Sequence, residues 1–131
     1  MVRHKIKVAL FLLIILGMWL GPNLEVHQAL AAPKVAKVIY VTMSKACGCT
    51  LTRCRIGDRV VDQVFAGARQ GLLQRLDYST EREAVRAIFK KYRVTQVPAL
   101  LLLDEQGNLL WMTAGELSAT EIEKQLAQFG N

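Results

Sequence analysis

Residues 37–54 read KVIYVTMSKACGCTLTRC, and this stretch is the starting point for predicting the fold. Residues 37–43 are β-branched and apolar for the most part and too few for a typical helix, which predicts a buried β-strand. The chain's three cysteines, Cys47, Cys49 and Cys54, follow this strand within eight residues. A tight group of thiols directly after a buried strand predicts chemistry at the end of that strand.

Apolar spacing predicts the next elements along the chain. Helical periodicity runs from about residue 52 to residue 68, and Gly71 is expected to end that helix. Residues 72–78 alternate sufficiently to predict a second strand. Thr80 and Glu83 then form a capping-box pattern, which predicts that another helix opens there.

The last third of the chain predicts two strands and a helix. Residues 99–103 (ALLLL) suit a central strand that is buried on both faces, residues 105–108 predict a hairpin turn, and residues 109–113 are the return strand. Ser118 and Glu121 repeat the capping-box pattern before the final helix. The order β-α-β-α-β-β-α predicts an α/β domain with a four-stranded mixed sheet and helices on both faces.

Composition excludes several classes of function. The 131 residues are 52% hydrophobic, which is unlike a disordered chain, and the net charge is +6 without a Lys/Arg run or an interleaved aromatic stripe, so we expect no nucleic-acid partner. The two histidines are His4 and His27. The absence of histidine after them excludes Ser-His-Asp and Cys-His catalysis, histidine-ligated zinc and C-x-x-C-H haem attachment from the remaining chain.

Residues 1–31 have the pattern of a signal peptide. Basic residues at positions 3–7 precede an apolar run over 8–20, and Ala29-Leu30-Ala31 offers a cleavage motif before Ala32. An uncleaved N-terminal anchor is the alternative, although thirteen apolar residues are short of the roughly 20 that span a bilayer. In both cases the domain at 32–131 is expected outside the cytoplasm, periplasmic or secreted, where cysteine pairs stay oxidised.

Taken together, these patterns resemble the thioredoxin-like superfamily across residues 36–130. The cysteines lie between the first strand and the first helix, and residues 94–99 (VTQVPA) are similar to the loop that carries the family's cis-proline. The hairpin at 104–108 and the glycine after it, Gly115, also match. The resemblance implies a thioredoxin fold without the extra N-terminal strand and helix, a cis bond before Pro98, and a Val97 backbone that faces the cysteines and pairs with an extended substrate.

The cysteine motif departs from the family pattern. The sequence has C-x-C followed by a third thiol instead of C-x-x-C, Ala46 instead of the usual Trp, and Val41 at the position of a buried acidic residue. By register from the first strand, Cys47 occupies the family's nucleophile position. Cys49 and Cys54 are then competing resolving thiols.

Helix geometry limits which cysteines can pair. In a helix that begins at Cys49, Cys54 lies about 7.5 Å further along the axis, beyond the Cα separation of roughly 4.4–6.8 Å that disulfides tolerate. A bond to Cys54 therefore requires residues 50–52 to be non-helical, which an N-cap at Thr52 would allow. Otherwise the bond joins Cys47 to Cys49.

The surroundings of the thiols favour redox chemistry over a purely structural disulfide. A helix N-terminus lowers the pKa of a nearby thiol, and the neighbouring charges are mainly basic. They are Lys45, Arg53, Arg55 and Arg59, with Asp58 the one acid among them. A structural disulfide across such a short loop would also restrain the unfolded chain less than one across a long loop.

We therefore expect extracytoplasmic thiol–disulfide exchange, a thioredoxin-like oxidoreductase activity, with catalytic residues Cys47, Cys49, Cys54 and Pro98 and with Val97 binding substrate. No cofactor beyond the redox-active disulfide is expected. The expected partners are protein thiols and disulfides, with a membrane thiol-electron donor as a candidate. Contact with the membrane is expected only through an uncleaved N-terminal segment, and the protein is expected to be a monomer.

Two alternatives stay open at this stage. Three thiolates without histidine suit a trigonal Cu(I) site, so binding or delivery of a soft metal by Cys47, Cys49 and Cys54 is the first. The second is a thioredoxin-like binding module without redox activity, in which the cysteines are dispensable. Metal analysis and reversible disulfide reduction discriminate among the three.

Overall fold

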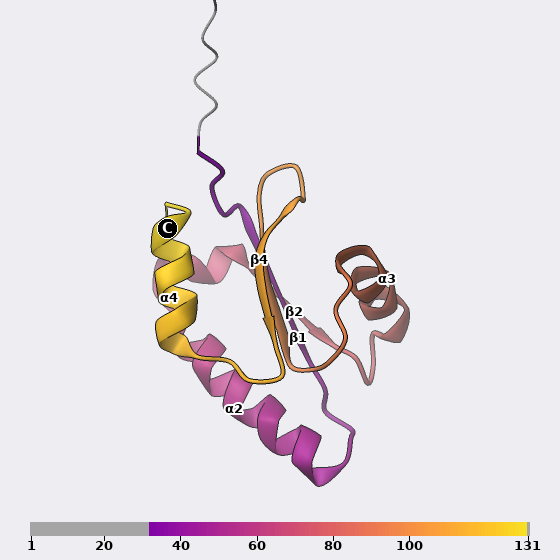
Figure 1. The fold of residues 1–131 in the computed structure, drawn as a ribbon. Coiled ribbons are helices and arrows are strands. Elements are labelled where there is room, and N and C mark those ends of the chain that lie inside the picture. Colours follow the sequence, from indigo (N-terminus) through magenta and orange to yellow (C-terminus); the bar gives the residue numbers. More distant parts are fainter. Residues whose placement is uncertain (1–31, 131) are drawn as a thin grey trace, which may run out of the picture. The chain divides into compact units, whose positions relative to one another are not determined.

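The computed structural model describes residues 32–130, which form one four-stranded sheet with helices packed on it (Figure 1). In chain order the elements are β1 (Lys37–Thr42), α2 (Gly48–Val64), the 3-10 helix η1 (Gly67–Leu72), β2 (Leu73–Asp77), α3 (Arg82–Tyr92), β3 (Ala99–Leu103), β4 (Leu109–Ala114) and α4 (Ala119–Gln128). The strand order is β2-β1-β3-β4, with β1 parallel to β2 and the other neighbours antiparallel. The predicted α/β class and mixed four-stranded sheet are confirmed.

The expected signal peptide at residues 1–31 lies outside the described residues. Within residues 32–130 none of the helices combines the length and the apolar character needed to cross a membrane.

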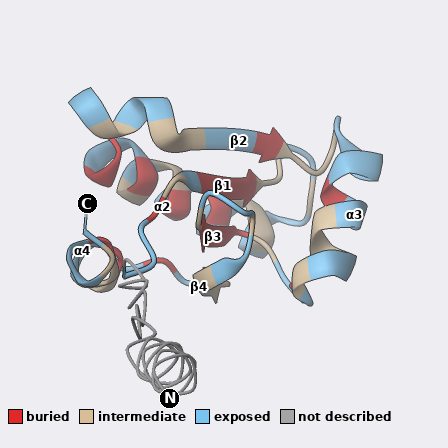
Figure 2. Ribbon diagram, turned by 90° about the horizontal axis from the view of Figure 1, so that it is seen from above, coloured by how far each residue is buried: buried red, intermediate tan, exposed pale blue. Residues whose placement is uncertain are grey.

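The sheet separates two hydrophobic cores, because consecutive strand residues point to opposite faces. Helices α2 and α4 cover one face and α3 covers the other (Figure 1). Val38 and Tyr40 of β1 belong to the core under α2 and α4, whereas Ile39 and Val41 belong to the core under α3. The predicted central strand is confirmed: β3 lies between β1 and β4, and each of its five residues is buried (Figure 2).

Helix α2 begins earlier than its apolar periodicity predicts. It starts at Gly48 instead of near residue 52 and ends at Val64, while the predicted stop, Gly71, lies in η1. Thr52 is therefore inside the helix and is not its N-cap, and its hydroxyl donates to the carbonyl of Gly48 at 2.9 Å. The first turn carries no buried side chain, so a search for an apolar stripe does not detect it.

The two capping-box predictions have different outcomes. Ser118 caps α4, and its hydroxyl accepts a hydrogen bond from the backbone N–H of Glu121, as predicted. The Thr80 box is wrong: the N-cap of α3 is Glu81, which makes no side-chain capping bond. The Glu81 carboxylate instead accepts from the backbone N–H of Asp77 at 2.9 Å, which closes the turn between β2 and α3.

At Gly57, α2 approaches the layer beneath it closely. A Cβ atom at this position would lie 2.8 Å from the Tyr40 hydroxyl and 3.1 Å from Cγ of Pro98, both of which are buried residues. Real Cβ atoms essentially never approach a neighbour to 2.8 Å, so a methyl group there would force the packing to shift. The missing side chain lets α2, β1 and the Pro98 loop meet.

We predict that Gly57→Ala destabilises the domain by about 1–3 kcal/mol, the usual cost of overpacking, even though alanine is favoured over glycine by about 1 kcal/mol within helices. Urea unfolding measures this difference. Gly71→Ala is the matched control, because no atom lies within 4 Å of its added Cβ.

The double variant Tyr40→Phe/Gly57→Ala identifies the clash. Removing the hydroxyl should make the combined loss smaller than the sum of the two single losses, because the atoms in conflict are then absent. Equal stability of Gly57→Ala and Gly71→Ala would contradict the close approach.

Candidate functional site

Two of the three cysteines lie side by side at the start of α2. Cys47 is the N-cap residue in an extended conformation, with φ −64° and ψ 156°, and Cys49 is the second residue of the helix. Both are exposed, and their Sγ atoms are 3.0 Å apart as free thiols. The hydroxyl of Thr50 lies 3.2 Å from the same Cys47 sulfur.

This arrangement makes Cys47 acidic. Hydrogen bonds from the Thr50 side chain, which is the largest cause, and from the Cys49 side chain lower the pKa of Cys47 to about 7. The position at a helix N-terminus acts in the same direction, because the unpaired N–H groups there carry partial positive charge. A large share of Cys47 is therefore thiolate near neutral pH, which is the nucleophilic form.

Cys54 lies apart from the other two thiols. It is only 2% exposed, whereas Cys47 and Cys49 are exposed. Residues 50–52 are helical, so Cys54 stands about 7.5 Å along the axis from Cys49 and about 140° around it. A bond between Cys54 and either exposed thiol would require the first turns of α2 to unwind, so this geometry leaves Cys47 and Cys49 as the pair within reach.

Metal binding by all three thiols finds no support in this geometry. Among residues 32–130 no group of three or more His, Cys, Asp and Glu side chains is close enough to hold an ion. Cys47 and Cys49 offer two adjacent sulfurs, and the third thiol faces the interior.

The loop before Cys47 is fixed by the end of the neighbouring strand. Asp77 pairs with Thr42 in the β1–β2 register, and its Oδ1 accepts from the backbone N–H of Ser44 at 3.1 Å. The Ser79 hydroxyl accepts from the N–H of Lys45 at 2.9 Å. Sequence analysis did not single out Asp77 or Ser79; polar residues at and just beyond the end of a strand predicted to lie parallel to β1 were the available signal.

The Pro98 loop is bonded to the residue that follows β4. The Val97–Pro98 peptide bond is cis, as the resemblance implied, and the carbonyl of Pro98 accepts from the N–H of Gly115 at 2.7 Å. Gly115 has φ +89°, and a Cβ there would lie 2.9 Å from the Gln96 side chain. The Gln96 side chain therefore occupies the space next to Gly115, and the positive φ is the feature that favours glycine there.

Val97 itself is half-buried beside an apolar depression. The depression has a volume of about 300 Å³ and is lined by Met43, Tyr78, Phe89, Thr95, Gln96 and Val97. Met43 belongs to the segment that leads from β1 to Cys47, so the depression borders the beginning of that segment.

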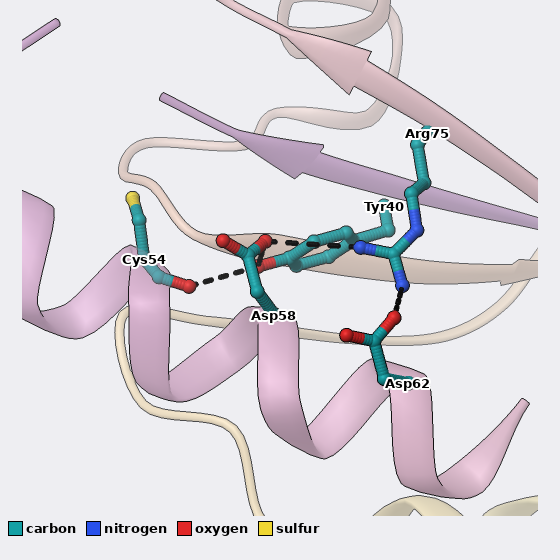
Figure 3. A network of polar contacts seen from close by, with 5 residues as sticks. All are labelled: Tyr40, Cys54, Asp58, Asp62 and Arg75. Atoms are coloured by element: carbon teal, nitrogen blue, oxygen red, sulfur yellow. Dashed lines mark hydrogen bonds and ion pairs between the residues drawn. The ribbon is translucent and has the colours of Figure 1, made fainter. Parts of the chain in front are cut away.

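A polar network ties α2 to the sheet beneath Cys54 (Figure 3). The Tyr40 hydroxyl lies 2.9 Å from Oδ1 of Asp58 and 3.3 Å from the carbonyl oxygen of Cys54. Burial raises the pKa of Tyr40 well above the ordinary value of a tyrosine, so the phenol stays protonated and donates its hydrogen bond. Arg75 of β2 pairs with Asp58 and with Asp62, and its guanidinium lies over the Tyr40 ring.

The sequence comparison placed Val41 at the position of the family's buried acidic residue, and the structure corrects this assignment. Val41 faces the core under α3, so it does not lie beneath the helix that carries the cysteines. Tyr40 occupies that place, and the acidic group near it is Asp58, contributed by the helix itself. A one-residue difference in strand register exchanges the two faces, and sequence comparison without a structure does not resolve it.

We predict that Thr50→Val raises the pKa of Cys47 above 7, because the thiolate loses its largest hydrogen-bond stabilisation. The pH at which iodoacetamide alkylation of Cys47 reaches half its maximal rate should move upward, so the variant reacts more slowly at pH 7. Thr50→Ser should keep the wild-type profile. Thr52→Val is the matched control, because the Thr52 hydroxyl bonds to Gly48 and not to a thiol; an equal shift in both variants would contradict the assignment.

The protein is similar to known proteins in its three-dimensional structure. No known family model matches the sequence, and no curated protein matches it. Among solved structures, Trxlp from Edwardsiella tarda EIB202 has a TM-score of 0.51 and 21% identity over 72% of this chain and 84% of that chain. The reduced C-terminal domain of DsbD from Neisseria meningitidis has a TM-score of 0.54 and 13% identity, over 74% of this chain and 83% of that one. Identity at this level shows the fold, and residues 32–130 therefore have the thioredoxin-like fold that the sequence resembles.

Proposed function

We propose that the protein catalyses thiol–disulfide exchange outside the cytoplasm, with Cys47 as the attacking thiol and Cys49 as the resolving thiol. The observation that carries this proposal is the pair of exposed sulfurs 3.0 Å apart at the N-terminus of α2. The lowered pKa of Cys47 supplies a thiolate at neutral pH, and the neighbouring thiol supplies the second step.

The exchange proceeds through a mixed disulfide. The Cys47 thiolate attacks one sulfur of a substrate disulfide, the substrate S–S bond breaks, and the departing substrate thiolate takes up a proton. Cys49 loses its proton and attacks the Cys47 sulfur, which releases the second substrate thiol and leaves a Cys47–Cys49 disulfide. Two electrons pass from the protein to the substrate, and a reduced thiol partner must return them before another cycle.

The Pro98 loop supports substrate binding in this proposal. Pro98 carries no N–H, and the backbone of Val97 is the candidate partner for an extended substrate strand. The hydrogen bond from Gly115 and the contact with Gly57 hold this loop from two sides. A substrate residue next to the reacting cysteine could place an apolar side chain in the depression beside Val97.

Cys54 has no direct part in the proposed exchange. Its burial and its position on the inner side of α2 favour a packing role, in which the thiol behaves as a small apolar side chain. The leader at residues 1–31, with cleavage near Ala32 or retention as an anchor, belongs to the same proposal. It would place the thiols where disulfides are exchanged, within reach of a membrane thiol donor.

The cysteine variants test the order of steps. Cys47→Ser should abolish reduction of a protein disulfide, because the serine hydroxyl stays protonated and is a poor nucleophile. Cys49→Ser should accumulate a mixed disulfide with substrate, detected as an adduct by non-reducing electrophoresis and mass spectrometry. Cys54→Ser, as the matched control, should turn over at a rate within about twofold of wild type, because its thiol is buried away from the other two.

Three results would contradict the proposal. Full activity of Cys47→Ser would remove the attacking thiol from its assigned place. Accumulation of the adduct in Cys54→Ser but not in Cys49→Ser would reverse the resolving role. Unchanged substrate binding with all three cysteines replaced, together with no reductase activity of the wild type, would favour a binding module without redox activity.

A further inference from the structure

The outer face of α2 carries an unusual set of side chains next to the thiols. Cys49, Ile56 and Arg59 are separated by seven and three residues, so in a helix with 3.6 residues per turn they lie on one face. Arg53 and Arg55 lie on the two sides of that line. All five side chains are exposed, and Ile56 is 45% exposed, which makes it the most exposed large hydrophobic residue among 32–130.

The positive charge of this face is not neutralised within the described domain. No carboxylate of residues 32–130 lies within ion-pair distance of Arg53, Arg55 or Arg59. The two acidic residues of the helix, Asp58 and Asp62, pair with Tyr40 and Arg75 of the sheet (Figure 3), and the Asp62 side chain is itself 68% exposed. The carboxylates of the helix are thus paired with the sheet, whereas its three exposed guanidinium groups have no acidic partner among residues 32–130.

Exposed arginines around an exposed isoleucine are the composition of a protein-binding surface. Arginine is enriched and most other charged residues are depleted at the centres of interfaces, and an apolar side chain there gains from burial. An anionic membrane is a weaker match, because a membrane-binding helix normally presents several large apolar side chains to the bilayer, and this face presents one.

We propose that this face, defined by Arg53, Arg55, Ile56 and Arg59, docks an acidic segment of the protein whose disulfide or thiol reacts at Cys47 and Cys49. The inference rests on the proposed exchange and names its substrate class. With a rise of 1.5 Å per residue, Ile56 lies about 10 Å and Arg59 about 15 Å along the axis from Cys49. An extended substrate covers that span in three to five residues, so the acidic residues stand three to five positions from the reacting cysteine.

Synthetic peptides test this inference. Three peptides share one cysteine, which carries thionitrobenzoate as a mixed disulfide, and have Glu, Gln or Lys at the third to fifth positions after it. Attack by the Cys47 thiolate on the peptide sulfur breaks this bond, and the released thionitrobenzoate chromophore reports the rate. Rates are expressed relative to the Gln peptide, so that any change in thiol reactivity cancels.

The reduced wild-type protein should react about tenfold faster with the Glu peptide than with the Gln peptide at low ionic strength, and added salt should reduce this preference. In Arg55→Gln/Arg59→Gln the preference should fall below about threefold. Lys90→Gln/Lys124→Gln is the matched control: it removes the same charge from exposed positions on α3 and α4, and it should keep the preference.

Each other outcome has a defined meaning. Equal rates for the three peptides, or an equal loss in the control variant, overturn the docking face and leave the exchange reaction intact. Absence of reaction with every peptide contradicts the exchange reaction itself. Sedimentation with phosphatidylglycerol vesicles but not with phosphatidylcholine vesicles, lost in the arginine variant while the peptide preference is absent, assigns the face to a lipid surface and also overturns the proposal.

Discussion

The relative positions of the parts of the site depend on the close approach at Gly57. Helix α2 can lie directly over Tyr40 and Pro98 because no side chain separates them. The helix carries Cys49 at one end and follows directly from Cys47, while Pro98 continues into the central strand β3. One contact therefore relates the thiols, the cis-proline loop and the most buried strand of the sheet, and displacement of the helix at this point would move all three relative to one another.

The polar network beside Gly57 adds direction to this packing. Hydrophobic burial already turns one face of α2, with Cys54, Val61 and Val64, toward the sheet. The bonds from Tyr40 to Asp58 and from Arg75 to Asp62 favour the same rotation and restrict it further, because hydrogen bonds and ion pairs need specific partners. The Arg75 pairs are more than one-third exposed, so each is worth at most about 1 kcal/mol, and their value is mainly geometric. The same rotation turns Arg55, Ile56 and Arg59 outward.

Sequence reasoning succeeded where a pattern has one physical explanation. Five consecutive apolar residues at 99–103 have no solvent face, so they predict a strand covered on both sides, and β3 is such a strand.

Sequence reasoning failed where a pattern has two competing explanations. The first turn of α2 carries no buried side chain and lacks an apolar stripe, so periodicity did not predict that it is helical. The capping box predicted from Thr80 and Glu83 does not form, because Asp77 and Glu81 bond to each other and close the turn before α3. Asp77, Ser79 and Tyr40 became part of the site only through pairing between distant segments.

The start of α2 decides what a C-x-C motif can do. Residues two apart within a helix are about 200° apart around its axis and do not face each other, so two cysteines at such positions would be separated. Here Cys47 is the N-cap, with extended backbone angles, and only Cys49 is inside the helix. The change from extended to helical backbone between them brings the two sulfurs to 3.0 Å and leaves Cys47 Sγ near the Thr50 hydroxyl. The position of the helix boundary, more than the identity of the intervening Gly48, therefore makes the shortened motif compatible with a reactive pair of thiols.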